Sequence, residues 1–185
     1  MVGKKNIVFG FIYLVLTAAL GLVMVDKYEA YGAAVQDKQA TVGRLQQLQT
    51  NDFEEMLEPL SGEEIAKANT AGVLSLNKLL NLESEIDGIK GGAHAHGNLE
   101  SLLNIVVGVV LGFLAINTIF KQVISWIFIA GALLHSGMLY LGTVFGLGWA
   151  NTILNTGIGP FLILIGLALA GIAAAMGYRG EPVKD

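Results

Sequence analysis

The stretch Gly91–Gly142 reads GGAHAHGNLESLLNIVVGVVLGFLAINTIFKQVISWIFIAGALLHSGMLYLG, and it decides the fold. It contains two apolar segments separated by Lys121 and carries all three histidines of the protein, His94, His96 and His135. An ionisable side chain at membrane depth is costly, so an intramembrane histidine indicates a functional site. The stretch therefore predicts membrane helices arranged around a histidine site.

The composition of the whole chain supports a membrane protein. Of its 185 residues, 54% are hydrophobic and 14% are charged, with a mean hydropathy of +0.62. Soluble domains carry about 25% charged residues. The absence of cysteine excludes disulfides and thiolate chemistry. Twelve of the 15 acidic residues lie between Asp26 and Asp87, and no basic stripe for nucleic acid is present.

The first candidate span is the apolar run from Ile7 to Val25, preceded by Lys4 and Lys5. Its length is close to the roughly 20 residues that cross the hydrocarbon core. A signal peptide has a shorter apolar region of about 7–15 residues and a small-residue cleavage site, for which Thr17-Ala18-Ala19 is a candidate. We interpret residues 1–25 as an uncleaved signal anchor, with cleavage as the alternative.

Residues 26–92 predict an extramembrane antiparallel helical hairpin. Apolar residues recur at helical spacing on both sides of a turn at Thr50–Leu60. Ser61-Gly62-Glu63-Glu64 fits a capping box at the start of the second helix. A docking arm or ligand sensor is the functional interpretation, and a spacer that packs on a neighbour is the plainer one, because amphipathic stripes usually serve packing.

Three further spans are expected in residues 93–185, at Leu99–Phe120, Val123–Thr143 and about 153–177, followed by a short cytoplasmic tail. The fold class is thus all-α, an integral membrane four-helix protein. Basic residues beside membrane ends collect on the cytoplasmic side. With four spans, Lys4, Lys5, Lys121 and Arg179 share one side. This predicts a multi-pass protein of the cell (inner) membrane with cytoplasmic termini and residues 26–92 outside.

Each of two spans carries a polar and small face. His96, Glu100 and Asn104 are four apart on one helix, in line with Gly108 and Gly112. On the next span His135 shares a face with Gly131, Met138 and Gly142. Small residues let membrane helices approach, and polar ones join them by hydrogen bonds. These two faces are expected to pack together, with Asn104 and His135 as a structural polar pair.

Three interpretations of the histidines remain open. His96, His94 and His135 are candidate ligands of a haem b held between adjacent helices. Alternatively His94, His96 and Glu100, with Met138, bind copper or zinc. HxH converges on a metal only in extended backbone, which Gly91-Gly92 would permit. The third interpretation is purely structural.

Depth along the helices bears on the haem interpretation. Counted from a turn near Lys121, His135 falls level with Asn104–Gly108, and His96 lies about 10–16 Å farther out. Two axial ligands of one haem need nearly equal depth. The count therefore favours a structural His135, or a haem that is ligated from another chain.

The segment HAHGNL at 94–99 resembles the HxHxNL-type opening of haem-binding helices in small membrane proteins related to subunit I of the haem–copper oxidases. LLHSGMLYLG at 133–142 is similar to later histidine-bearing helices of respiratory membrane proteins. The resemblance implies a haem b ligated by His94 or His96 and electron transfer linked to quinone or oxygen. Glu100 departs from the apolar pattern, and the acidic hairpin has no counterpart.

These observations predict a small haem- or metal-binding redox (electron-transfer) subunit with its site near the outer face. The alternative is a non-catalytic interaction, sensor or accessory protein whose hairpin contacts a partner. Proton transport through His96 and Glu100 is a weaker third, since no inverted repeat is evident. Expected partners are the lipid bilayer, a membrane protein or a second copy, and quinone. No hydrolytic or phosphate-binding motif is present, so no enzyme is claimed.

Overall fold

A computed structural model describes residues 1–183 of the chain. It is mostly helical, as predicted, and contains one short two-stranded sheet. The chain forms two compact units. The first, here called the bundle, comprises Met1–Leu22 and the segment from Gly88 onward; the second, here called the helix pair, comprises Val23–Asp87.

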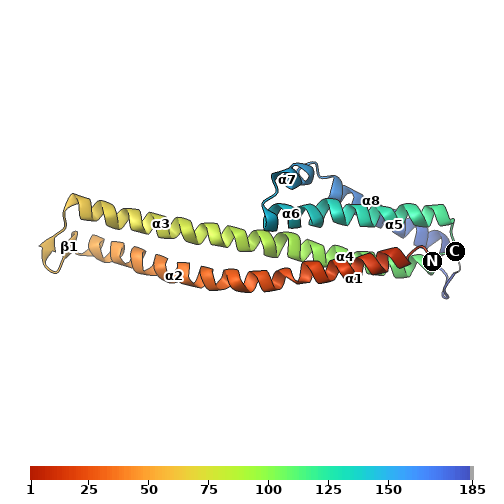
Figure 1. The fold of residues 1–185 in the computed structure, drawn as a ribbon, viewed down its shortest axis with the longest axis horizontal. Helices are drawn as coiled ribbons and strands as arrows, with labels where there is room; N and C mark the ends of the chain where they lie inside the picture. Colours follow the sequence, from red (N-terminus) through yellow and green to blue (C-terminus); the bar gives the residue numbers. More distant parts are fainter. Residues whose placement is uncertain (184–185) are drawn as a thin grey trace. The chain divides into compact units, whose positions relative to one another are not determined.

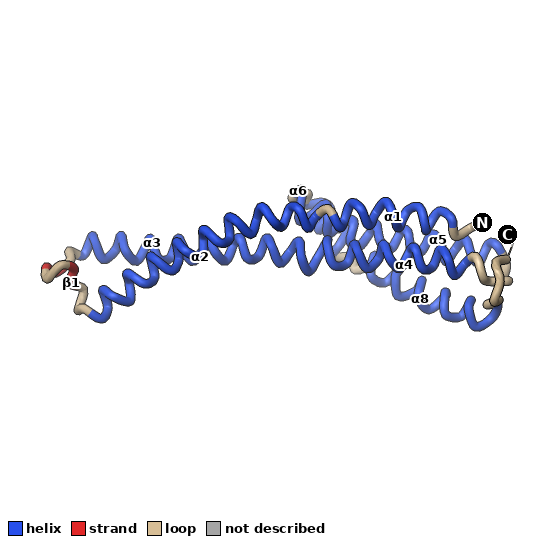
Figure 2. The backbone as a smooth tube through the Cα atoms, turned by 90° about the horizontal axis from the view of Figure 1, so that it is seen from below, coloured by secondary structure: helices blue, strands red, loops and turns tan. Residues whose placement is uncertain are grey.

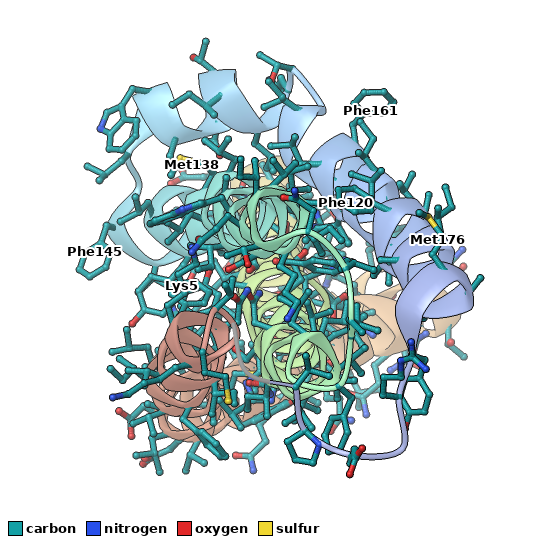
Figure 3. All side chains as sticks on the ribbon, turned by 90° about the vertical axis from the view of Figure 1, so that its right-hand side faces the viewer. Lys5, Phe120, Met138, Phe145, Phe161 and Met176 are labelled. Atoms are coloured by element: carbon teal, nitrogen blue, oxygen red, sulfur yellow. The ribbon has the colours of Figure 1, made fainter. Side chains whose placement is uncertain are left out.

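Within residues 1–183, three helical segments are long and apolar enough to cross a membrane: Lys4–Thr50, Thr118–Phe145 and Ile158–Gly177. The first consists of α1 (Lys4–Ala18) and α2 (Leu20–Thr50), and the last is α8. Large apolar side chains are exposed on them. Phe161 and Met176, for example, point outward from α8 (Figure 3). Surfaces of this kind are suited to contact with lipid.

In the bundle, α1 packs along α4 (Ala95–Leu111) (Figure 2). Small residues make this contact close. A methyl group on Gly108 would lie 2.6 Å from the backbone oxygen of Gly3. One on Gly10 would lie 2.6 Å from the backbone oxygen of Ser101. Small residues at such positions allow two membrane helices to approach closely. The sequence therefore brings α1 near enough to α4 for short polar side chains to meet.

The second half of the bundle is built from α5 (Thr118–Ala132), the π-helix η2 (Leu133–Gly137), α6 (Met138–Phe145), α7 (Gly148–Leu154) and α8 (Ile158–Gly177). Helix α5 packs against both α4 and α8. The apolar core lies between these three helices: Val107, Leu111, Leu114, Ile124, Phe128, Ile163 and Ala173.

The connection between α4 and α5 corrects the predicted span limits. Helix α4 ends at Leu111, and α5 starts at Thr118 behind an Asn117 cap whose side chain accepts from the Ile119 amide at 2.7 Å. The expected spans Leu99–Phe120 and Val123–Thr143 placed this turn near Lys121. Apolar residues continue through the turn, so hydropathy alone did not reveal it. The C-terminal segment closes over the same end, where Arg179 donates its backbone N–H to the Phe113 oxygen.

In the helix pair, α2 and α3 (Gly62–Asp87) lie side by side (Figure 1). The Thr41 and Ser75 hydroxyls are 2.6 Å apart, and Lys27 forms a salt bridge with Glu85. Between α2 and α3 the strands β1 (Glu54–Glu55) and β2 (Glu58–Pro59) form a small antiparallel hairpin. The predicted capping box is confirmed, because the Glu64 backbone N–H donates to Ser61 Oγ at 3.3 Å and the Ser61 N–H donates to Glu64 Oε2 at 2.8 Å.

The glycine-rich segment after α3 is helical and does not adopt the extended backbone that Gly91-Gly92 would permit. Residues Gly88–His94 form the π-helix η1, which leads directly into α4. A π-helix still satisfies the backbone amides while changing the direction in which side chains point. His94 and His96 therefore stand on helical backbone and not on the extended strand that their convergence required. Residues Gly88–His94 belong to the bundle.

Candidate metal centre

The candidate site begins with two residues one turn apart on α4, His96 and Glu100. They lie on one helix face, as the i, i+4 spacing predicts. Glu100 is only 3% exposed, whereas His96 is exposed. A buried carboxylate requires partners that compensate for its lost hydration.

The partners of Glu100 come from the π-helix η2. His135 Nδ1 lies 2.5 Å from Glu100 Oε1, and Ser136 Oγ donates to Glu100 Oε2 at 2.5 Å. His135 and Ser136 are consecutive residues, and each engages a different carboxylate oxygen. Single turns of π-helix inside α-helices are frequent at functional sites, because they reorient neighbouring side chains. The π-turn between α5 and α6 contains both residues that contact the Glu100 carboxylate.

His96 completes a group of three. Its ring centre lies 4.7 Å from that of His135, with the planes 58° apart. One potential ligand atom from each of His96, Glu100 and His135 can be chosen so that all three lie within 4.8 Å of one another. The group is graded from the exposed His96 to the buried Glu100. It thus has an open side at His96 and an anchored side at Glu100.

A network of buried polar groups extends the site toward α1. The Tyr13 hydroxyl is 2.9 Å from Ser136 Oγ. Asn104 donates to the Glu100 backbone oxygen at 3.0 Å, and Asn6 donates to the Asn104 side-chain oxygen at 3.0 Å. Ser125 donates in turn to Asn6. Within residues 1–183, every buried side-chain nitrogen or oxygen has a partner, as buried polar groups require.

The structure separates His94 from the predicted ligand set of His94, His96 and Glu100. His94 Nδ1 lies 2.9 Å from the backbone oxygen of Thr17, and its Nε2 lies 3.4 Å from the Asn98 side chain. Because the backbone at His94–His96 is helical, the two histidines point to different neighbours. His135 takes the place of His94 beside Glu100. Met138 lines an apolar cavity of about 410 Å³ together with Tyr13.

The direct pair expected between Asn104 and His135 is replaced by an indirect one. His135 bonds the Glu100 carboxylate, while Asn104 bonds the Glu100 backbone and Asn6. The depth count behind the pairing was wrong because it centred the turn on Lys121. With the turn at residues 112–117, His96 and His135 are level and their rings touch.

Haem and a small ion place different demands on this group. Imidazole nitrogens stand about 2 Å from a metal, so two rings on opposite faces of one haem would have centres about 6 Å apart. The rings of His96 and His135 are 4.7 Å apart, and Glu100 is hydrogen-bonded to His135. A haem between them would need the helices to part. The three potential ligand atoms lie within 4.8 Å of one another, a separation at which they could hold a single ion.

Comparison with known proteins adds nothing to these observations. No family model, no curated protein and no solved structure matches the chain. The candidate site is therefore defined by the side chains themselves.

Proposed function

We propose that this chain is an integral membrane metal-binding protein whose centre is formed by His96, Glu100 and His135. The observation that carries the proposal is the convergence of two imidazoles and a buried carboxylate within 4.8 Å. Imidazole and carboxylate ligands suit zinc, copper and iron. Three protein ligands with an open position are typical of centres that act on a further molecule, in contrast to closed structural sites. The exposed His96 provides that open side.

A redox role for the centre is the corresponding functional proposal. It is supported by the resemblance of HAHGNL and LLHSGMLYLG to helices of respiratory membrane proteins, which implies His94 or His96 as the haem ligand. Copper or iron would carry one electron, whereas zinc would not. Electron exchange with a quinone or a membrane partner, and a haem b in place of the ion, belong to the same proposal and are distinguished by the spectra below.

Metal analysis and an absorption spectrum of the purified protein test the proposal. We expect about one equivalent of transition metal and, for a redox centre, an optical or electron paramagnetic resonance signal that a reductant changes. His96→Ala and His135→Ala should each lose the metal. His94→Ala is the matched control and should retain it, because His94 bonds Thr17 and Asn98 outside the triad.

The alternative outcomes have separate meanings. A Soret band in the wild type that disappears in His94→Ala would show that the cofactor is a haem and not a single metal ion. Wild-type protein with neither metal nor haem, even after incubation with zinc and copper, would overturn the metal centre.

We further propose four spans, with α4 as the additional one, cytoplasmic termini, and the helix pair outside. Helix α4 has 17 residues and packs between α1 and α5, which would shield its polar residues from lipid. The Lys5 ammonium donates to the Gln122 side-chain oxygen, and the Arg179 backbone N–H donates to the Phe113 oxygen, so these bonds place basic residues of distant segments at one end of the bundle. Basic residues favour the cytoplasmic side.

The cysteine-free chain allows a direct test of this topology. A single cysteine at Gln47 should react with an impermeant thiol reagent from outside, and one at the exposed Ile119 only after the membrane is opened. The reverse pattern would invert the proposed orientation, and labelling of both from outside would contradict the four spans.

A second candidate function, docking of a partner on the helix pair, rests on its tip. Met56 and Leu57 are 95% and 92% exposed between acidic residues, and both have left-handed φ angles of 55° and 67°. Large apolar residues are poorly suited to that backbone, which favours Asn-Gly. A photo-crosslinker at Leu57 should capture one defined membrane partner, and one at the exposed Leu80 should not. Replacing Met56-Leu57 by Asn-Gly should preserve the turn but abolish the adduct; absence of any adduct contradicts this function.

A further inference from the structure

A groove lies at the end of the bundle where α1 and α5 begin, away from the histidines. Its volume is about 660 Å³. Met1, Val2 and Val8 form an apolar wall, and Lys4, Lys5, Thr118 and Gln122 supply polar groups. Two lysines and no acidic residue line it. The groove is thus amphipathic and cationic.

The polar side of the groove is organised before any ligand binds. Lys5 donates to the Gln122 side-chain oxygen, and its ammonium lies 4.2 Å from the centre of the Trp126 ring. Because Gln122 accepts through its oxygen, its amide nitrogen is left to donate. The exposed Lys4 and the Thr118 hydroxyl add further donors. Figure 3 shows Lys5 on the side of α1 that faces α5. A ligand here would meet donors, which suits a phosphate.

The apolar wall indicates whether that phosphate belongs to a lipid headgroup or is a free anion. Val8 continues into the exposed Ile12 along α1, and Val123 and Trp126 are exposed on α5. Both helices belong to segments apolar enough to cross the membrane. A free phosphate would gain nothing from this surface, whereas a lipid would place its acyl chains along it. Trp126 is of the residue type enriched at membrane interfaces.

We infer that the groove binds the headgroup of an anionic phospholipid, with the phosphate at Lys4 and Lys5 and the acyl chains along Val8 and Val123. Basic pockets between membrane helices on the cytoplasmic side bind anionic headgroups. The inference does not depend on the metal centre, which lies in other residues of the bundle.

Trp126 is a built-in reporter of this site. In a Trp149→Phe background it is the only tryptophan. The protein is reconstituted with acyl-brominated phosphatidylglycerol or acyl-brominated phosphatidylcholine at equal mole fraction, and quenching of Trp126 is compared. We expect the anionic lipid to bind more tightly, with Lys4→Gln reducing the preference about fivefold and Lys4→Gln with Lys5→Gln removing most of it. Comparing two lipids within each variant corrects for the altered environment of Trp126.

Arg179→Gln is the matched control, because it removes one positive charge without touching the groove. It should leave the lipid preference unchanged, and added inorganic phosphate should not displace the brominated lipid. Equal quenching by both lipids in the wild type would overturn the inference. So would an equal loss in Arg179→Gln and Lys4→Gln, which would indicate a diffuse charge effect, or displacement by inorganic phosphate, which would indicate a site for the free anion.

Discussion

In the part of the chain that the structure describes, a serine hydroxyl donates a hydrogen bond to the carboxylate of Glu64 in the helix pair and to that of Glu100 in the bundle. Ser61 lies three residues before Glu64 at the start of α3, and their contact is exposed to solvent. Ser136 lies far from Glu100 in sequence, and both are buried. The same chemistry therefore caps a helix in one unit and joins two helices around a candidate ligand in the other. Burial determines how much each contact contributes, because exposed polar groups regain water when they lose a partner.

The largest difference between the two units is expected in the metal affinity after each carboxylate is replaced. Glu100→Gln should lower metal affinity by about 100-fold or more, because it removes the anionic ligand and not merely a supporting contact. Glu64→Gln should leave metal affinity unchanged. Competition with a chromophoric chelator measures both variants. Equal metal affinity in the two proteins would remove Glu100 from the centre.

A second comparison concerns the stability lost when a buried or an exposed asparagine is replaced. Asn104→Leu should destabilise the protein by about 1–2 kcal/mol, because Asn6 and the Phe128 oxygen lose a partner inside the bundle. Asn77→Leu, at an exposed position of α3, should change stability by less than about 0.5 kcal/mol. Unfolding of the full chain in mild detergent measures both. If the two variants unfold alike, the Asn6–Asn104 contact does not stabilise the bundle.

Replacing Ser136 and replacing Ser61 should affect different properties, metal binding in the first case and helix capping in the second. Ser136→Ala should weaken metal binding about tenfold, since it frees Glu100 Oε2 and removes the partner of Tyr13. Ser61→Ala should affect only the first turn of α3 and leave the metal in place. Metal titration with circular dichroism on the same samples separates the effects. A metal affinity unaltered by Ser136→Ala would show that the ligand is oriented by His135 alone.

The smallest effect concerns pH. The hydroxyl and the backbone N–H of Ser61 lower the pKa of Glu64 below its ordinary value of 4.5. A carboxyl with a depressed folded-state pKa contributes stability above its unfolded-state pKa and loses it as pH falls through the folded-state value. The NMR signal of the backbone amide at position 61 should therefore shift at a pH below 4.5 in the wild type. In Ser61→Ala the same shift should occur at a higher pH, because the hydroxyl no longer lowers the Glu64 pKa. A Glu64 titration at the ordinary value in both proteins would contradict the capping contact.

Much of the helix content and part of the site follow from local pattern. The apolar run after Lys5, the Ser61–Glu64 capping box and the His96–Glu100 face are all readable at short spacing. Other members of the network were missed, namely Asn6, Tyr13, Ser125 and Ser136. A signal for the first helix was present, since Asn6, Gly10, Tyr13 and Thr17 recur at helical spacing and form its buried face. Polar residues that line one face of an apolar helix predict a partner helix there.

The sequence by itself determined that the chain is helical, that several helices are apolar enough for a bilayer, and that His96 and Glu100 share a face. Only the tertiary structure decided that His135 joins them and His94 does not. The physical reason is register. Helical periodicity relates residues within one helix, whereas the relative height of two helices depends on where the turn lies and how each helix is wound. The turn at residues 112–117 and the π-helices η1 and η2 set that height, and neither changes the local hydropathy enough to be recognised in advance.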